Sequence, residues 1–165
     1  MSAPTTVKRL RFEDTVQYDT MTYSAWTTNY SKSAVFAILN DDDNKIYDIT
    51  EWIGEFNFTH NEIDADGAGR DKKTGRMTRK FVATKHDIQV KLVDGVTQPI
   101  AHEFLMLLED HNSHSFTLYW QHPCRDNAIK SSEFYCSTVN FGAMRWRKSD
   151  NVCYFTGMNF KVIQM

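Results

Sequence analysis

The sequence predicts a mainly β domain (α+β), built as a β-sandwich or split barrel with one flanking α-helix. Aromatic residues make up 13% of the 165 residues and there are only 3 prolines, a composition that suits pleated, half-buried strands. Many short segments alternate between apolar and polar residues, and only one has a helical period. We therefore expect a single domain over residues 34–165, preceded by an extended arm over residues 1–33.

The predicted arm is rich in Thr, Tyr and Ser, and its apolar residues are too scattered to define a helix face. We expect one or two weak strands in it, ordered by contact with a partner. The domain then begins with an apolar run at residues 34–39. Residues 40–44, Asn-Asp-Asp-Asp-Asn, favour a turn, and residues 45–49 return as the second strand of a hairpin.

A long β-hairpin that protrudes from the body is predicted over residues 52–93. Residues 52–63 alternate well enough for a strand, and residues 79–93 form the clearest strand of the chain. Each exceeds the usual five or six residues. One face of the second strand carries the apolar residues and His86, and the other face is polar, so one face should be buried.

The flanking helix is predicted over residues 98–111. Thr97 can cap it, Pro99 falls in its first turn, and Ile100, Phe104 and Leu107 mark one apolar face that should cover a sheet. Strands follow at residues 116–120, 132–139, 144–148 and 152–163. The last two are joined at residues 149–151, Ser-Asp-Asn, which tolerate the positive φ of a tight turn.

The polar loop of the long hairpin offers two kinds of ligand chemistry, and neither fits. In an EF-hand count from Asp64 the sixth place holds Gly69, but the fifth holds Ala68 and the twelfth Gly75, so oxygen ligands are missing. A phosphate loop needs a helix N-terminus, whereas this loop precedes a strand. No cofactor or metal is therefore expected.

No catalytic pattern stands out elsewhere. His111, His114 and His122 lie near the helix end and the next strand, where a polar loop explains them more simply than a metal site does. The three cysteines lack paired spacing and a catalytic context. We expect no enzyme. The run Arg145-Trp146-Arg147-Lys148 resembles those of single-stranded nucleic-acid binders. A strand with its cations on a solvent-exposed face and Trp146 buried on the other face explains this pattern better.

The formal charge of −2 gives no global field for nucleic acid or an anionic membrane. No run approaches the ~20 apolar residues of a membrane span, and nothing resembles a signal peptide. Synthesis in a reducing host cytoplasm is expected.

The order of parts, and a local pattern over about residues 45–163, resemble small structural proteins of bacteriophage tails, the tail-tube and baseplate proteins. The pattern combines the loop Asp64-Ala65-Asp66-Gly67-Ala68-Gly69-Arg70-Asp71, then Thr74-Gly75-Arg76-Met77, the helix segment Glu103-Phe104-Leu105-Met106-Leu107-Leu108, and Phe116-Thr117-Leu118-Tyr119-Trp120.

The resemblance implies a virion tail protein that forms stacked homo-oligomeric rings with other tail proteins, around a channel that DNA crosses without sequence-specific binding. The hairpin loop would pack on the next protomer. The candidate assembly residues of the loop are Asp64, Asp66, Gly67, Gly69, Arg70, Asp71, Lys72, Lys73, Gly75 and Arg76. The candidate contacts of the arm are Tyr18, Tyr23, Trp26 and Tyr30.

The alternative function is a carbohydrate- or surface-binding β-sandwich module. It would explain the excess of aromatic residues, because tyrosine and tryptophan stack on sugar rings. It predicts a monomer or small oligomer with an exposed aromatic platform. A hydrolase would instead need histidines and carboxylates that converge in a pocket.

Overall fold

The computed structural model describes residues 3–30, 35–64, 69–70, 77–78, 81–109, 115–121 and 128–165. Its helices are α1 (Tyr23–Tyr30), η1 (Thr50–Trp52) and α2 (Gln98–Glu109). Its strands are β1 (Thr6–Leu10), β2 (Tyr18–Thr22), β3 (Phe36–Asn40), β4 (Lys45–Asp48), β5 (Ile53–Asp64), β6 (Gly69–Arg70), β7 (Met77–Thr78), β8 (Phe81–Leu92), β9 (Val96–Thr97), β10 (Phe116–Gln121), β11 (Ile129–Asn140), β12 (Ala143–Arg147), β13 (Val152–Thr156) and β14 (Asn159–Gln164).

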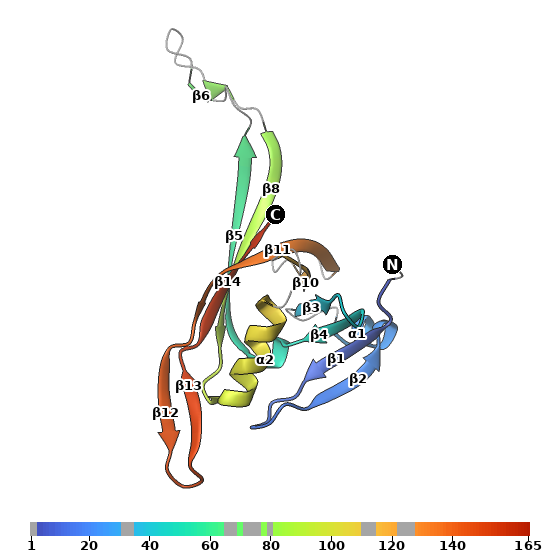
Figure 1. Cartoon of the computed structure of the whole chain (residues 1–165). Helices are drawn as coiled ribbons and strands as arrows, with labels where there is room; N and C mark the ends of the chain where they lie inside the picture. Colours follow the sequence, from blue (N-terminus) through green and yellow to red (C-terminus); the bar gives the residue numbers. More distant parts are fainter. Residues whose placement is uncertain are drawn as a thin grey trace.

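A curved sheet of nine strands forms the body, in the order β2-β1-β4-β3-β10-β11-β14-β8-β5. Its pairs are antiparallel except β1 with β4, which run parallel. The sheet curls around α2, while β5 and β8 project from one end of the body and the β12–β13 hairpin from the other (Figure 1). A smaller sheet, β12-β13-β9, lies beside the start of α2.

Two cores lie on opposite faces of β3 and β4. Phe36 and Ile38 of β3 belong to the larger core with Phe104 of α2, whereas the alternate residues Ala37 and Leu39 belong to a smaller core with Trp26 of α1. Because side chains alternate across a strand, this part of the sheet is covered on both faces. That explains why residues 35–39 are an uninterrupted buried run.

The sequence-based fold class is confirmed: the chain is mainly β with a helix against the sheet. The predicted helix at residues 98–111 is α2, Gln98–Glu109, and residues 110–111 lie outside the described residues. Asn44 and Asn151, both in predicted turns, have φ of 55° and 57°. His86, Ile88, Val90 and Leu92 are buried, as their alternation predicts.

The sequence predicts an extended arm with one or two weak strands over residues 1–33, and the described part of this segment has two strands together with a helix that was not predicted. Residues 6–30 form β1, β2 and α1, and β1 adds to the main sheet through parallel pairing with β4. Val7, Leu10 and Trp26 are fully buried. The prediction missed α1 because the helix has little amphipathic pattern, and missed the docking because its partner strand is about 40 positions away in the chain.

Two further corrections concern the C-terminal strands. The strand predicted over residues 152–163 is divided into β13 and β14 at Gly157, whose φ is +76°. Trp146 was expected to be buried, but it is 60% exposed. Its strand projects past the end of the body, so the sheet position alone does not cover it (Figure 1).

Candidate assembly surfaces

The β5–β8 hairpin is anchored to the body by aromatic packing at its base. Phe56 and Phe58 of β5 stack with ring centroids 5.8 Å apart, and Phe58 lies 6.3 Å from the ring of Trp120. One step further along, His60 pairs with His86 in register, with ring centroids 5.1 Å apart. These ring contacts attach the base of the hairpin to the body.

Beyond this base the hairpin becomes a two-stranded ribbon. β14 pairs with β8 only from Asp87 to Lys91, whereas β5 pairs with β8 as far as Phe81. The backbone N–H of His86 donates to Oε1 of Gln164 at 2.9 Å, and Lys85 Nζ donates to the carbonyl of Met165. The last residues of β14 and Met165 therefore contact β8 at the position where the two-stranded ribbon begins. A ribbon of two strands has little stability in water by itself.

Both ends of the nine-stranded sheet present an edge strand. β5 pairs with β8 on one side, and β2 pairs with β1 at the opposite end; no strand among the described residues pairs with the outer side of either. Such edges carry unpaired backbone donors and acceptors that another chain can engage.

The predicted assembly residues of the hairpin loop are only partly placed. Asp64 ends β5, and Gly69 and Arg70 form β6, which pairs with Met77–Thr78 of β7 and so extends the hairpin. Seven candidates lie outside the described residues: Asp66, Gly67, Asp71, Lys72, Lys73, Gly75 and Arg76.

Three of the four arm candidates are tied to the body of their own chain. Trp26 is fully buried, and its Nε1 donates to Oδ2 of Asp48 at 2.8 Å. The hydroxyl of Tyr18 donates to Glu103 on α2, and Tyr23 packs edge-on to Tyr119. The side chain of Tyr30 lies outside the description. Trp26 is thus a core residue, whereas Tyr23 keeps part of its ring at the surface.

Two tyrosines bridge the sheet to acidic side chains. Burial, and then the hydrogen bond to Glu103, raise the pKa of Tyr18 well above its ordinary value. Burial, and then a hydrogen bond to Asp43, also raise the pKa of Tyr47, whose ring stands edge-on to Tyr18 at 5.3 Å. Tyr18 therefore couples β2 to α2 as a neutral hydrogen-bond donor.

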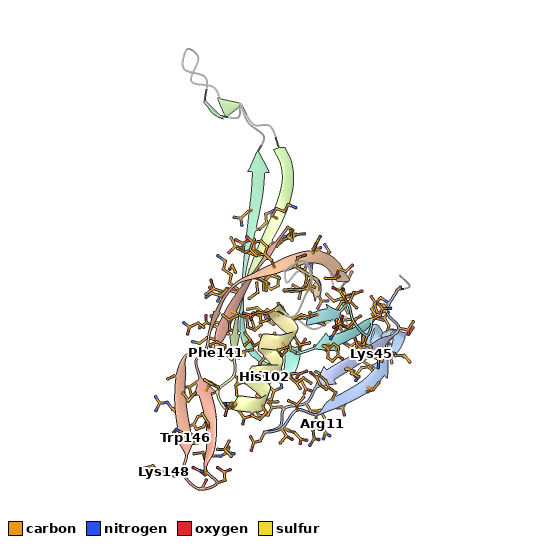
Figure 2. All side chains as sticks on the ribbon, in the orientation of Figure 1. Arg11, Lys45, His102, Phe141, Trp146 and Lys148 are labelled. Carbon is orange, nitrogen blue, oxygen red and sulfur yellow. The ribbon has the colours of Figure 1, made fainter. Side chains whose placement is uncertain are left out.

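A second surface, which the sequence reasoning missed, is the β12–β13 hairpin. Met144 and Trp146 of β12 are 57% and 60% exposed, and Phe141, just before β12, is also exposed. Met144 lies opposite Phe155 and Trp146 opposite Cys153, so they share the face that is buried nearer α2. Phe141, Met144 and Trp146 are here called the apolar ridge. Figure 2 shows Phe141 and Trp146 on the part of the chain that leads into and forms this hairpin.

The other face of this hairpin is cationic and is held by ion pairs. Arg147 contacts both Asp14 of the β1–β2 loop and Asp150 of its own turn at 2.8 Å. The hydrogen bond that Arg147 donates lowers the pKa of Asp150, and the positive charge of Arg147 lowers it further by a smaller amount. Arg145 and Lys148 are exposed. The pairing with Asp14 sets the hairpin against the β1–β2 loop.

The described residues contain no cluster of three or more His, Cys, Asp or Glu side chains with metal-site geometry, and His111, His114 and His122 lie outside them. Burial raises the pKa of the Cys136 thiol to about 11, which keeps it protonated at neutral pH. No helix in the described part of the chain is long and apolar enough to cross a membrane.

No protein-family model matches the chain, and no curated protein matches it. Solved structures that are similar to it include two chains of gene transfer agent particles. One is a chain from the tail of an empty GTA particle, determined with helical refinement at C6 symmetry; it has 8% identity and a TM-score of 0.47, over 80% of this chain and 90% of that chain. The other is a chain from the virion of a native gene transfer agent (GTA) particle, with 10% identity and a TM-score of 0.44, over 79% and 90%.

Proposed function

We propose that the protein is a structural subunit of a phage-like tail, a tail-tube or baseplate component of the virion, that assembles into homo-oligomeric rings through the β5–β8 hairpin. The observation that supports this proposal is the geometry of the β5–β8 hairpin. Two strands of twelve residues leave the body together, and the outer half of the ribbon has no third strand among the described residues.

Physical chemistry favours an assembly role for such an element. A two-stranded ribbon contributes little to the stability of a monomer, because an isolated pair of strands is marginally stable in water. Against a neighbouring copy, its edge can pair with backbone groups and its mixed charges can meet opposite ones. The loop supplies those charges: four cations, Arg70, Lys72, Lys73 and Arg76, stand among Asp64, Asp66 and Asp71.

The rings would be closed by a head-to-tail contact. In such a contact the two meeting surfaces differ, and a rotation that closes gives a ring. The two edge strands of the sheet, β5 and β2, lie at opposite ends of its strand order, which suits this arrangement. The rings would stack, together with other tail proteins, around a channel that DNA crosses without sequence-specific binding.

The test shortens the hairpin without unfolding its base. Because Asp64 and Phe81 are paired, replacing residues 65–80 by Asn-Gly joins them through a two-residue turn. Size-exclusion chromatography and negative-stain microscopy should show rings or tubes for the intact protein at high concentration and monomers for the shortened variant. Matching circular dichroism and thermal unfolding of the two would establish that the fold is retained.

Two outcomes would contradict this proposal. One is an intact protein that stays a monodisperse monomer at high concentration, and the other is a shortened variant that still assembles. The sugar-binding alternative is less favoured, because the exposed Trp146 shares its face with Met144, Cys153 and Phe155 rather than with polar groups that could bond sugar hydroxyls. Retention of the monomer on a polysaccharide column would favour that alternative.

A further inference from the structure

We infer that the free edge of β12 receives the β5 edge of the next copy of this chain, so that strands of two copies pair in the head-to-tail contact. The inference rests on the proposed function and specifies which surface of one copy meets the hairpin of the next. β12 is an outer strand of the sheet β12-β13-β9, and β5 is an outer strand of the nine-stranded sheet. A strand from another chain can complete such an edge with backbone hydrogen bonds.

The β12 edge lacks the features that keep edge strands from pairing. The strand contains no proline, its pairing with β13 has no bulge, and it projects from the body (Figure 1). Met144 and Trp146 on one of its faces are 57% and 60% exposed. Arginine can discourage pairing at an edge, but Arg147 is held by Asp14 and Asp150 of its own chain. A flat, exposed edge with large apolar side chains is a site where another strand adds.

β5 offers a second regular edge. It is twelve residues long and contains no proline, and no strand among the described residues pairs with its outer side. From Glu55 to Ile63 its register with β8 continues without a shift. Asn57 and Thr59 are exposed along this stretch. The outer side of β5 therefore presents an even row of backbone groups to a partner strand.

The charges of the two strands have opposite signs, which selects a second copy as the occupant. β5 contains no lysine or arginine, and its carboxylates are Glu55, Glu62 and Asp64. β12 contains no acidic residue, and its cations are Arg145 and Arg147. Opposite charges on adjacent strands stabilise their pairing, and like charges destabilise it. Pairing of β12 with β5 is therefore favoured over pairing of β12 with the β12 of another copy.

The order of residues at the outer end of β5 also matches β12. Ile63 stands between two acidic residues, as Trp146 stands between two arginines. Because alternate residues of a strand share a face, a register with Trp146 beside Ile63 places Arg145 beside a carboxylate on the other face. The apolar ridge and Arg145 would thus meet opposite faces of one partner strand, while Arg147 stays bound within its own chain.

The edge of β2 is the other surface that could receive β5, and it fits less well. Its one charged residue is Asp19, which has the same sign as the carboxylates of β5. Its larger apolar side chains, Tyr18 and Met21, are half-buried and pack on the cores of their own chain. β2 therefore offers β5 neither an opposite charge nor a strongly exposed apolar side chain.

The positions of the two edges suit a head-to-tail contact. Figure 1 shows β5 and β8 projecting from one end of the body and the β12–β13 hairpin from the other. A contact between different surfaces of identical copies is heterologous, and it closes into a ring where the rotation between copies allows it.

Charge reversal tests the pairing. Arg145→Glu with Lys148→Glu, in β12 and just after it, should weaken assembly roughly tenfold or more in analytical ultracentrifugation. Glu62→Lys with Asp64→Lys, the charge-reversed β5 variant, should weaken it similarly. All four changes in one chain should restore assembly, because the strands then carry opposite charges again. Arg147 stays unchanged, since it serves contacts within the chain.

Two control variants accompany these changes, with circular dichroism to confirm that each variant is folded. Glu109→Lys, at an exposed site on α2, should assemble normally. Asp19→Lys, on β2, should also assemble normally. Stronger assembly of Asp19→Lys, with no loss in the charge-reversed β5 variant, would mean that β2 receives β5 and would overturn the inference.

Tryptophan fluorescence gives an independent readout. Trp146 is 60% exposed, whereas the other three tryptophans are at most 2% exposed. Acrylamide should therefore quench the charge-reversed β5 variant strongly and the assembled, unchanged chain weakly. Met144→Ser with Trp146→Ser should weaken assembly roughly tenfold or more, whereas Met165→Ser, also exposed, should not.

The outcomes separate this inference from the proposed function. If the intact protein forms rings but the four changes together fail to restore assembly, or Trp146 stays equally quenchable in the ring, the β5–β12 contact is wrong while the ring stands. If the intact protein forms open chains that the same reversals weaken and restore, the contact is right and the ring is wrong. An intact protein that stays a monomer at high concentration would overturn both.

Discussion

At the scale of single residues, Tyr18 shows how a side chain from the N-terminal segment joins the body. It crosses from β2 to α2 and donates to Glu103, a residue 85 positions further along the chain. Tyr18 was predicted from sequence as an arm contact with a neighbour, and that role stays a prediction. What the sequence could not supply is the partner, because a local pattern carries no information on contacts so distant in the chain.

The raised pKa of Tyr18 predicts a stability that depends on alkaline pH. The unfolded tyrosine loses its proton near pH 10.0, whereas the folded protein retains it, since burial and the bond to Glu103 favour the neutral form. Stability from this group is therefore complete below pH 10 and falls as the pH rises above it, by at most about 1.4 kcal/mol per pH unit.

Urea unfolding at several pH values from 8 to 11 measures this effect. Tyr18→Phe should show a shallower loss of stability above pH 10 than the unchanged chain does. Tyr135→Phe, on an exposed ring in the sheet, is the matched control. Equal pH dependence in the Tyr18→Phe variant and the unchanged chain would rule out the assigned role.

At the scale of elements, the β12–β13 hairpin depends on the backbone of one glycine. Gly142 has φ of +70°, and a Cβ there would lie 2.1 Å from the carbonyl oxygen of Thr156. Gly157 has a similar φ of +76°, but a Cβ there meets nothing within 4 Å. The two positions therefore separate backbone strain from steric conflict.

Gly142→Ala should destabilise the protein more than Gly157→Ala. The left-handed backbone costs roughly 1–2 kcal/mol in both variants. The clash with Thr156 adds roughly 1–3 kcal/mol in Gly142→Ala alone. The free energy of unfolding from urea titrations compares them, and equal losses would mean that the hairpin base adjusts without cost.

The strands were more predictable than their surroundings. Alternation placed the buried face of β8 correctly, and turn chemistry placed Asn44 and Asn151 at positive φ. Trp146 was misplaced because alternation identifies a face, whereas burial also needs something to cover that face. The run at residues 34–39 did hold an unused signal: a strand that is apolar at every position is usually covered on both sides, here by α1 and α2.

At the scale of the whole molecule, the N-terminal segment completes the fold rather than preceding it. β1 lies between β2 and β4, and Trp26 covers Ala37, Leu39 and Ile46 on one face of the sheet. A protein that begins at residue 34 would expose that face and leave the edge of β4 open.

Deletion of residues 1–30 should therefore abolish cooperative unfolding or leave the protein insoluble. Removing residues 1–3 is the control and should leave the melting curve unchanged. Circular dichroism during heating measures both. If the protein without residues 1–30 unfolded cooperatively at the midpoint of the full chain, residues 34–165 would be an independent domain, as the sequence suggested.

By itself, the sequence determined the local character of this protein: mainly β structure, the helix over Gln98–Glu109, the turns and the long β5–β8 hairpin. These follow from side-chain periodicity and backbone preference, which act over a few residues. Only the tertiary structure decided that residues 6–30 join the main sheet, that Trp26 is buried and that Trp146 is exposed. Those outcomes depend on which distant segments cover each face of the sheet. Burial of apolar surface is favourable whichever segment covers it, so its position in the chain does not decide the contact.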